Sequence, residues 1–152
     1  MKGIFSSKSL LHSKRILREL VLLKRLSPHP YIVELIDIIE PDDKEKFDEI
    51  YLVLELADMD LRKLIKSMKH LTLNEVRTLT YKLLCCLNYL HSAKIIHRDL
   101  KPNNILVSNT KNLLTNEDNP VEDWHIKICD LGLARSMVGV ESDQIITEVF
   151  GR

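Results

Sequence analysis

Residues 96–106 place three polar side chains of different chemistry within a short loop. Asp99 supplies a carboxylate, Lys101 an ammonium group and Asn104 a carboxamide, and apolar residues flank them on both sides. Together these groups can position a hydroxyl nucleophile, offset the charge of a transferring phosphoryl group and hold a divalent metal. Three polar residues in a loop are usually a solvated turn, but apolar flanks typical of buried strands favour a site.

A second acidic motif, Asp130-Leu131-Gly132, lies downstream of that loop. Alone it is weak evidence, because Asp and Gly adjoin in many turns. Its context strengthens it, since the strand-like run 126–129 comes directly before it. A carboxylate at this point adds a hard oxygen ligand of the kind that Mg²⁺ prefers.

The composition is that of an ordinary soluble globular protein with one modest domain. The 152 residues are 45% hydrophobic and 29% charged, which suffices for a real core. A formal net charge of zero gives no field that favours nucleic acid or an anionic membrane as a partner. No apolar stretch reaches the roughly 18 residues of a membrane span. Three cysteines do not suggest a disulfide framework, which fits a cytoplasmic or nuclear location.

Periodicity in the first part of the chain predicts one helix and one hairpin. Residues 9–26 carry apolar side chains at helical spacing, and the proline-containing stretch 27–30 ends that helix. Residues 32–39 and 50–54 are apolar, β-branched runs separated by a charged stretch. We expect them to form an antiparallel hairpin.

The next segments predict two helices and an exposed insertion. Residues 60–68 form a short helix in this interpretation. Thr72 and Glu75 make a capping-box pattern that opens a longer helix. Residues 108–124 are polar and read as an insertion, and residues 136–152 lack periodicity. The face of the longer helix that we expect to be buried carries Val76, Leu79, Leu83, Leu87 and Leu90.

The loop at 96–106 contains H-R-D-L-K-x-x-N and resembles the catalytic loop of eukaryotic protein kinases. The motif at Asp130 resembles the kinase metal-binding D-F-G, with Leu131 in place of Phe. The likeness runs in order over nearly the whole chain and points to the mitogen-activated protein kinase group, with cyclin-dependent kinases next. It implies an α+β, protein-kinase-like two-lobe fold and transfer of the ATP γ-phosphoryl group to Ser or Thr of proteins, with Mg²⁺.

The resemblance also implies how the chain is divided. Residues 1–53 would belong to a partial small lobe, 54–60 to the hinge and 61–152 to a partial large lobe with catalytic loop and activation segment. We expect the fold to be incomplete at both ends, because the glycine-rich phosphate loop and the Ala-Pro-Glu run have no counterpart here. The alternative function is a catalytically inactive kinase fragment that acts as a binding module, or a truncated gene product.

Four side chains carry the catalytic roles that the resemblance implies. Asp99 would accept or orient the proton of the substrate hydroxyl, and Lys101 would contact the γ-phosphate of ATP. Asn104 and Asp130 would hold Mg²⁺. A basic residue at Lys101 follows the Ser/Thr-kinase pattern.

The resemblance assigns another set of residues to the nucleotide. The main-chain groups of Glu55 and Ala57 would bind adenine, and Leu106 would form the floor of its pocket. Cys129 would face this pocket, although burial as an apolar filler is the alternative.

Three polar residues have both a nucleotide role and a plainer explanation. Lys2 would contact the phosphates, or it is a solvated terminal lysine. Glu19 would pair with that lysine, or it is a surface glutamate on a helix. Asp60 would face the ribose, or it caps the helix that follows.

The resemblance also implies protein substrates and an upstream activating kinase. Arg98 would receive a phosphate or an acid from the activation segment. Thr147-Glu148-Val149 resembles a Thr-x-Tyr phosphorylation pair in which Val replaces Tyr, so Thr147 is the candidate phosphosite. In an alternative register, anchored on Arg152, Ile146 occupies the threonine position.

Overall fold

The computed structural model describes residues 10–39, 50–67, 71–109 and 124–137. Helix α1 (Leu10–Leu26) confirms the first predicted helix, and Ile16, Leu23 and Leu26 lie on its buried side. The amide of Ser27 donates to the carbonyl oxygen of Leu23 at 2.9 Å. Pro28 follows at once and has no amide hydrogen to continue the ladder, so the helix ends here.

The predicted hairpin is confirmed. Strand β1 (Leu35–Ile39) pairs antiparallel with β2 (Tyr51–Leu54), and Leu35 lies opposite Leu54. The register shifts between Leu35 and Asp37, so the pairing contains one irregularity. Ile36, Ile38 and Ile39 of β1 remain exposed.

A three-stranded antiparallel sheet forms the centre of the structure. Its order is β3 (Met59–Asp60), β5 (Ile105–Asn109) and β6 (Trp124–Ile128). Side chains alternate between the two faces, as they must in a strand. The buried face carries Ile105, Val107, Ile126 and Ile128, whereas Leu106 and its partner Lys127 lie on the opposite face.

Helix α2 (Leu61–Ser67) and helix α3 (Leu73–Ser92) confirm the two predicted helices. The capping box at the start of α3 is complete. The amide of Glu75 donates to Thr72 Oγ1 at 3.3 Å, and the Glu75 carboxylate accepts from the amide of Thr72 at 2.7 Å. Both interactions satisfy amides that the helix itself leaves unpaired.

The predicted buried face of α3 is partly wrong. Leu79 and Leu90 are buried and Leu83 and Leu87 are partly buried, but Val76 is 44% exposed. Cys86 is fully buried instead and points its thiol at the carbonyl oxygen of Ile126, 3.8 Å away. Val76 lies in the first turn, next to the exposed Leu73, so the buried stripe begins one turn later than periodicity predicts.

The sequence did not predict a second short pairing. Strand β4 (Ile95–Ile96) pairs antiparallel with β7 (Arg135–Ser136). The short helix η1 (Pro102–Asn104) forms the last three residues of the H-R-D-L-K-x-x-N motif, and η3 (Leu131–Leu133) follows Asp130. The two motifs therefore lie between paired strands, which hold their ends together.

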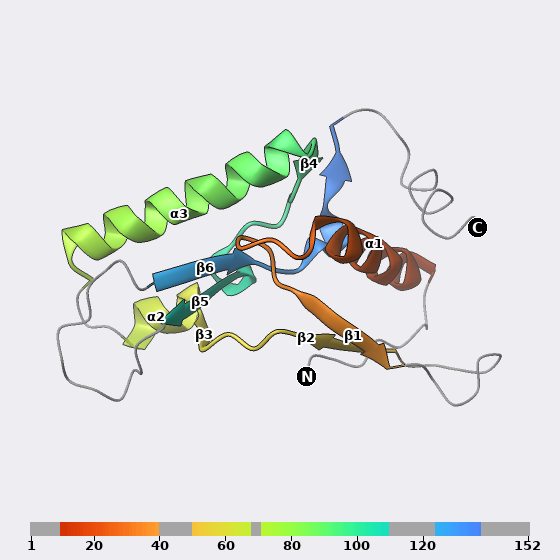
Figure 1. Cartoon of the computed structure of the whole chain (residues 1–152), viewed down its shortest axis with the longest axis horizontal. Coiled ribbons are helices and arrows are strands. Elements are labelled where there is room, and N and C mark those ends of the chain that lie inside the picture. The colour runs from red at the N-terminus through yellow and green to blue at the C-terminus, as the bar shows by residue number, and fades with distance from the viewer. Residues whose placement is uncertain (1–9, 40–49, 68–70, 110–123, 138–152) are drawn as a thin grey trace.

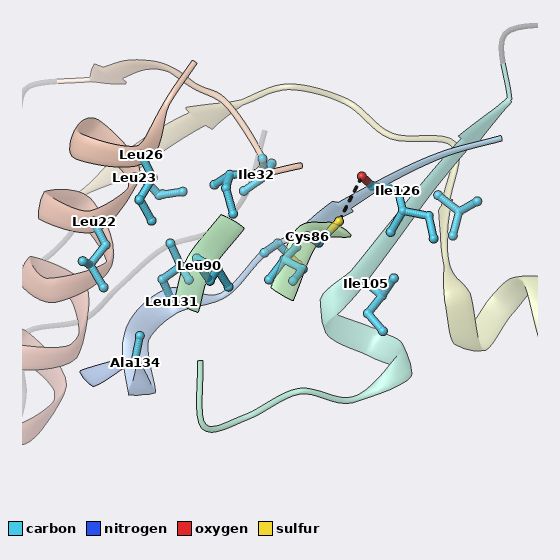
Figure 2. Close-up of a cluster of buried hydrophobic side chains, with 14 of the residues drawn as sticks. Leu22, Leu23, Leu26, Ile32, Cys86, Leu90, Ile105, Ile126, Leu131 and Ala134 are labelled. Carbon is cyan, nitrogen blue, oxygen red and sulfur yellow. Dashed lines mark hydrogen bonds between the residues drawn. The ribbon is translucent and has the colours of Figure 1, made fainter. Parts of the chain in front are cut away.

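Two groups of elements share one core (Figure 1). Helix α1 and the β1–β2 hairpin lie on one side, α2, α3 and the central sheet lie on the other, and an extended stretch joins β2 to β3. Figure 2 shows α1 leucines beside Leu90 of α3 and Leu131 of η3. The main chain adds a link, because Val33 and Ile128 join through a 3.0 Å hydrogen bond. The expected α+β fold is confirmed.

Replacement of Thr72 by Ala should destabilise the protein by about 1 kcal/mol, because it leaves the amide of Glu75 in the first turn of α3 without its acceptor. Urea unfolding followed by circular dichroism measures this loss. Thr80→Ala is the matched control, since Thr80 is exposed inside α3 and Ala favours the helix. Equal stability of Thr72→Ala and the wild type would contradict the role of the cap.

Candidate functional site

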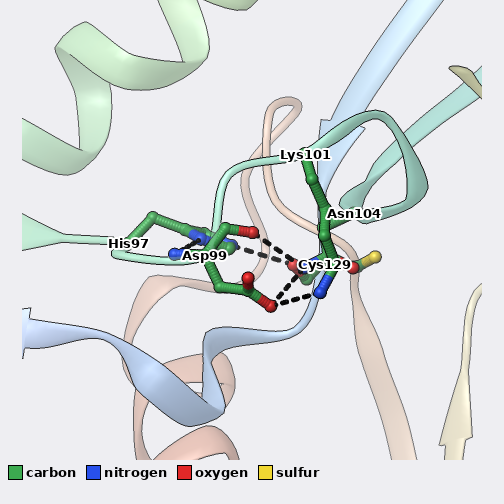
Figure 3. Close-up of polar contacts among 5 residues, drawn as sticks. All are labelled: His97, Asp99, Lys101, Asn104 and Cys129. Atoms are coloured by element: carbon green, nitrogen blue, oxygen red, sulfur yellow. Dashed lines mark hydrogen bonds and ion pairs between the residues drawn. The ribbon is translucent and has the colours of Figure 1, made fainter.

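The loop between β4 and β5 gathers the three polar side chains around one carboxylate oxygen (Figure 3). Lys101 Nζ donates to Asp99 Oδ2 at 2.6 Å, and Asn104 Nδ2 donates to the same atom at 3.1 Å. Asn104 Nδ2 also reaches the Asp99 carbonyl oxygen at 2.9 Å. Asn104 is buried, so a well-packed amide fixes the carboxylate.

The charges of Asp99 and Lys101 stabilise each other. The hydrogen bond from Lys101 is the main reason that the pKa of Asp99 lies below its ordinary value, and Asn104 adds to the effect. The same hydrogen bond raises the pKa of Lys101. The Asp99 side chain is 27% exposed and that of Lys101 is 49% exposed, so both remain open to solvent and to a ligand.

His97 connects this loop to the segment that carries Asp130. Its ring is buried, with Nε2 at 3.0 Å from the carbonyl oxygen of Cys129. Its Nδ1 accepts from the amide of Asp99 at 3.2 Å. Since Nδ1 accepts from Asp99, Nε2 is the ring nitrogen that can donate to the carbonyl oxygen of Cys129.

A second link runs through Asn104. The amide of Cys129 donates to the carbonyl oxygen of Asn104 at 3.1 Å. Asp130 comes next in the chain, and its charge contributes to the raised pKa of Lys101. The structure therefore brings Asp99, Lys101, Asn104 and Asp130 together, as the sequence predicts.

Two residues of this site adopt left-handed backbone conformations. Arg98 has φ of 69° and Asp130 has φ of 62°. Such conformations cost a non-glycine residue about 1 kcal/mol or more and concentrate at functional sites. One of them directly precedes Asp99 and the other is Asp130 itself, so a left-handed residue lies at each of the two acidic groups.

Helix α1 also contacts the Asp130 motif. Arg18 donates through its guanidinium to the carbonyl oxygen of Gly132 at 2.8 Å. A Cβ atom at Gly132 would lie 3.4 Å from Asp130 Oδ1 and 3.7 Å from Arg15, so this glycine lies within ordinary contact distance of both residues. Glu19 is buried on the same helix, so its alternative interpretation as a surface glutamate is wrong. Lys2, its expected partner, lies outside the described residues.

The stretch between β2 and β3 borders a pocket of about 210 Å³. Three of the residues expected at adenine, Glu55, Ala57 and Leu106, line this pocket. Leu56, Ser108, His125 and Lys127 complete its lining, and the acidic groups of the catalytic loop are not part of it. The pocket therefore contains three of the residues expected at adenine and none of Asp99, Lys101 and Asn104.

Two further candidates have a structural role in this conformation. Asp60 Oδ1 accepts from the amide of Lys63 at 2.7 Å, so it caps α2 as its alternative interpretation holds. Cys129 is buried within the core cluster, which agrees with an apolar filler. Their roles toward ribose and adenine stay predictions. Thr147 lies outside the described residues.

Sequence reasoning missed Lys127, whose Nζ lies 2.6 Å from Glu55 Oε2. A signal was present, because Lys127 stands between Ile126 and Ile128 in an alternating strand. Its side chain must therefore leave the core on the face that also presents Leu106.

Oxygen ligands available here suit magnesium. Within residues 10–39, 50–67, 71–109 and 124–137, no group of three or more His, Cys, Asp or Glu residues is placed to hold a metal. Magnesium needs fewer protein ligands, since substrate phosphates and water complete its shell. The Asn104 amide and the Asp130 carboxylate fit that pattern. None of the helices in the described part of the chain has the length and apolarity to cross a membrane.

Comparison with known proteins gives one family and a consistent set of relatives. The family model of the protein kinase domain matches residues 1–151. The chain is 40% identical to mitogen-activated protein kinase 13 of Arabidopsis thaliana over 136 residues, 90% of this chain and 33% of that protein. It is 42% identical to mitogen-activated protein kinase homolog 1 of Petunia hybrida over 134 residues, 88% of this chain and 31% of that protein.

A third relative agrees with these two. Mitogen-activated protein kinase homolog NTF6 of Nicotiana tabacum is 40% identical over 124 residues, 82% of this chain and 30% of that protein. The chain therefore spans about one third of the length of these curated relatives.

Replacement of Lys101 by Met should raise the pKa of Asp99, because the hydrogen bond from Lys101 is the largest cause of its lowering. An NMR titration of the Asp99 carboxyl carbon measures the shift. Lys66→Met removes an exposed lysine on α2 and should leave that titration unchanged. A pKa of Asp99 as low in Lys101→Met as in the wild type would contradict this electrostatic account.

Proposed function

Because the chain belongs to the protein kinase domain family, we propose that it transfers the γ-phosphoryl group of ATP to serine or threonine of proteins, as mitogen-activated protein kinases do. Its α+β structure is consistent with part of a two-lobe kinase fold. The observation that carries the proposal is the single carboxylate oxygen of Asp99 that binds both Lys101 and Asn104.

Asp99 acts on the substrate hydroxyl. An aspartate is ionised near neutral pH and the bond from Lys101 lowers its pKa further, so it can accept a hydrogen bond from the incoming hydroxyl and orient it. Asn104 holds the carboxylate from one side, which leaves fewer orientations to lose when substrate binds. Positioning of this kind supplies most of the catalysis in phosphoryl transfer.

Lys101 acts on the phosphoryl group. A lysine is charged near neutral pH and the bond to Asp99 raises its pKa further, and a half-exposed side chain can reach a bound phosphate. Asn104 and Asp130 would hold Mg²⁺, which neutralises phosphate charge when bound. The buried His97 holds the two loops at a fixed separation through Asp99 and Cys129.

The pocket beside β5 and β6 receives adenine in this proposal. The main-chain groups of Glu55 and Ala57 pair with the base, and Leu106 supplies an apolar floor. Asp60 serves the ribose in addition to capping α2. Glu19 pairs with Lys2 to contact the phosphates, and Cys129 lies at the back of the site.

The regulatory part of the proposal rests on the family. Arg98 is exposed and its left-handed backbone turns it away from the core, which suits a receiver of phosphate. An upstream kinase would modify Thr147, and protein substrates would bind across the large lobe. We assign residues 1–53 to the small lobe, 54–60 to the hinge and 61–152 to the large lobe, and we place the protein in the cytoplasm or nucleus.

Asp99→Asn should lower phosphotransfer by about 10²- to 10⁴-fold, because the amide orients a hydroxyl poorly and accepts no proton. The assay follows the γ-phosphate of labelled ATP into a generic protein acceptor, using the full-length gene product. Asp37→Asn is the matched control, since Asp37 is exposed on β1 and away from both loops. Phosphotransfer by Asp99→Asn at the wild-type rate would contradict the proposal.

A further inference from the structure

Glu55 uses both oxygens of its carboxylate, and each bonds to a different part of the fold. Oε2 lies 2.6 Å from Lys127 Nζ on β6. Oε1 accepts from the amide of Glu34, just before β1, at 3.1 Å. The amide of Glu55 also donates to the carbonyl oxygen of Glu34 at 3.0 Å.

Glu55 lies where its bonds can link three segments of the fold. It is the first residue after β2, in the stretch that joins β2 to β3. Figure 1 shows that this stretch is the connection between the hairpin and the central sheet. A single carboxylate thus links the connection, the chain just before β1 and the sheet strand β6.

Burial separates this ion pair from an ordinary surface contact. The side chains of Lys127 and Glu55 are 27% and 23% exposed, so water and salt screen the pair less than they screen an open one. The backbone of Lys127 is held in place, because its neighbours Ile126 and Ile128 are buried in the core. The cation that meets Glu55 is therefore attached to a fixed point of the sheet.

The same two residues line the 210 Å³ pocket, together with Ala57 and Leu106. The side chain of Glu55 bonds to Lys127 and its amide bonds to the carbonyl oxygen of Glu34, so these contacts together restrain the backbone at Glu55. Ala57 lies two residues further along, so the direction of its main-chain groups depends on the backbone conformation at Glu55.

We propose that Glu55 and Lys127 are positioning residues, whose ion pair holds the backbone of residues 55–57 in the conformation that binds adenine. This inference rests on the proposed function and assigns a role to two side chains that the kinase chemistry itself does not use. It implies that loss of the pair weakens ATP binding and leaves the transfer step unaffected.

Lys127→Met should raise the KM for ATP by about three- to tenfold with kcat nearly unchanged, because the pair acts on binding geometry rather than on the reacting atoms. Glu55→Gln is the second variant. It keeps the shape of the side chain and the oxygen that accepts from Glu34, but it turns an amide NH2 group toward Lys127, so it removes the charge and the acceptor of the ion pair and should fold. Lys127→Arg should restore a KM close to the wild-type value, because it restores the cation. Lys66→Met, on the exposed side of α2, is the control for loss of a lysine.

A ligand-free measurement separates this inference from the proposed function. Hydrogen exchange of the amides at residues 55–57, in the full chain without nucleotide, should be faster in Lys127→Met and Glu55→Gln than in the wild type and Lys66→Met. Unchanged exchange in both variants, or a fall in kcat with KM for ATP unchanged, would overturn the inference. If the wild type transfers no phosphate, the proposed function fails, while the exchange rates still decide whether the pair holds this backbone.

Discussion

One oxygen atom, Oδ2 of Asp99, organises the candidate site. It accepts from Lys101 and from Asn104, and those two donors define its charge and its direction. Asn104 extends the arrangement, because its carbonyl oxygen accepts from Cys129 and thereby places Asp130 beside the loop. Asn104 therefore contacts the carboxylate through its side chain and the segment before Asp130, the proposed metal ligand, through its main chain, and so sets the separation between the two acids. The proposed chemistry needs all three, since positioning provides most of the rate in phosphoryl transfer.

The apolar core makes this polar arrangement rigid. Leu23 of α1, Leu90 of α3, Ile128 of β6 and Leu131 of η3 are fully buried in one cluster. Each such side chain stabilises the fold by about 1.5–3 kcal/mol relative to exposure. Ile128 and Leu131 flank Cys129 and Asp130, so the residues that carry the chemistry lie between two anchors. The strain of a left-handed Asp130 is offset by this packing.

Most helices and strands that follow from a local sequence pattern were predicted from the sequence. Helical spacing, the capping box at Thr72 and the β-branched runs around β1 and β2 all led to the observed elements, because local physics determines them. The Asp99 loop was found because its residue types are specific for one chemistry.

Contacts between distant residues were harder to predict. The β4–β7 pairing, the bond from Arg18 to Gly132 and the Glu55–Lys127 pair join residues up to 114 positions apart, and no local pattern encodes them. The burial of Val76 was predicted wrongly, because periodicity gives the apolar face of a helix but not the point along the helix where other elements cease to pack against that face.

The central claim is that Asp99, Asn104 and Asp130 surround one metal–nucleotide complex. Paramagnetic broadening by Mn²⁺ and ATP tests it directly, with Mg²⁺ and ATP as the diamagnetic reference and NMR signals of single residues as the readout. The account predicts that addition of Mn²⁺ with ATP broadens the signals of Asp99, the Asn104 side-chain amide and Asp130 together, and spares Asp37 on β1. Broadening at Asp130 without any at Asp99 and Asn104, or at none of the three, would contradict it.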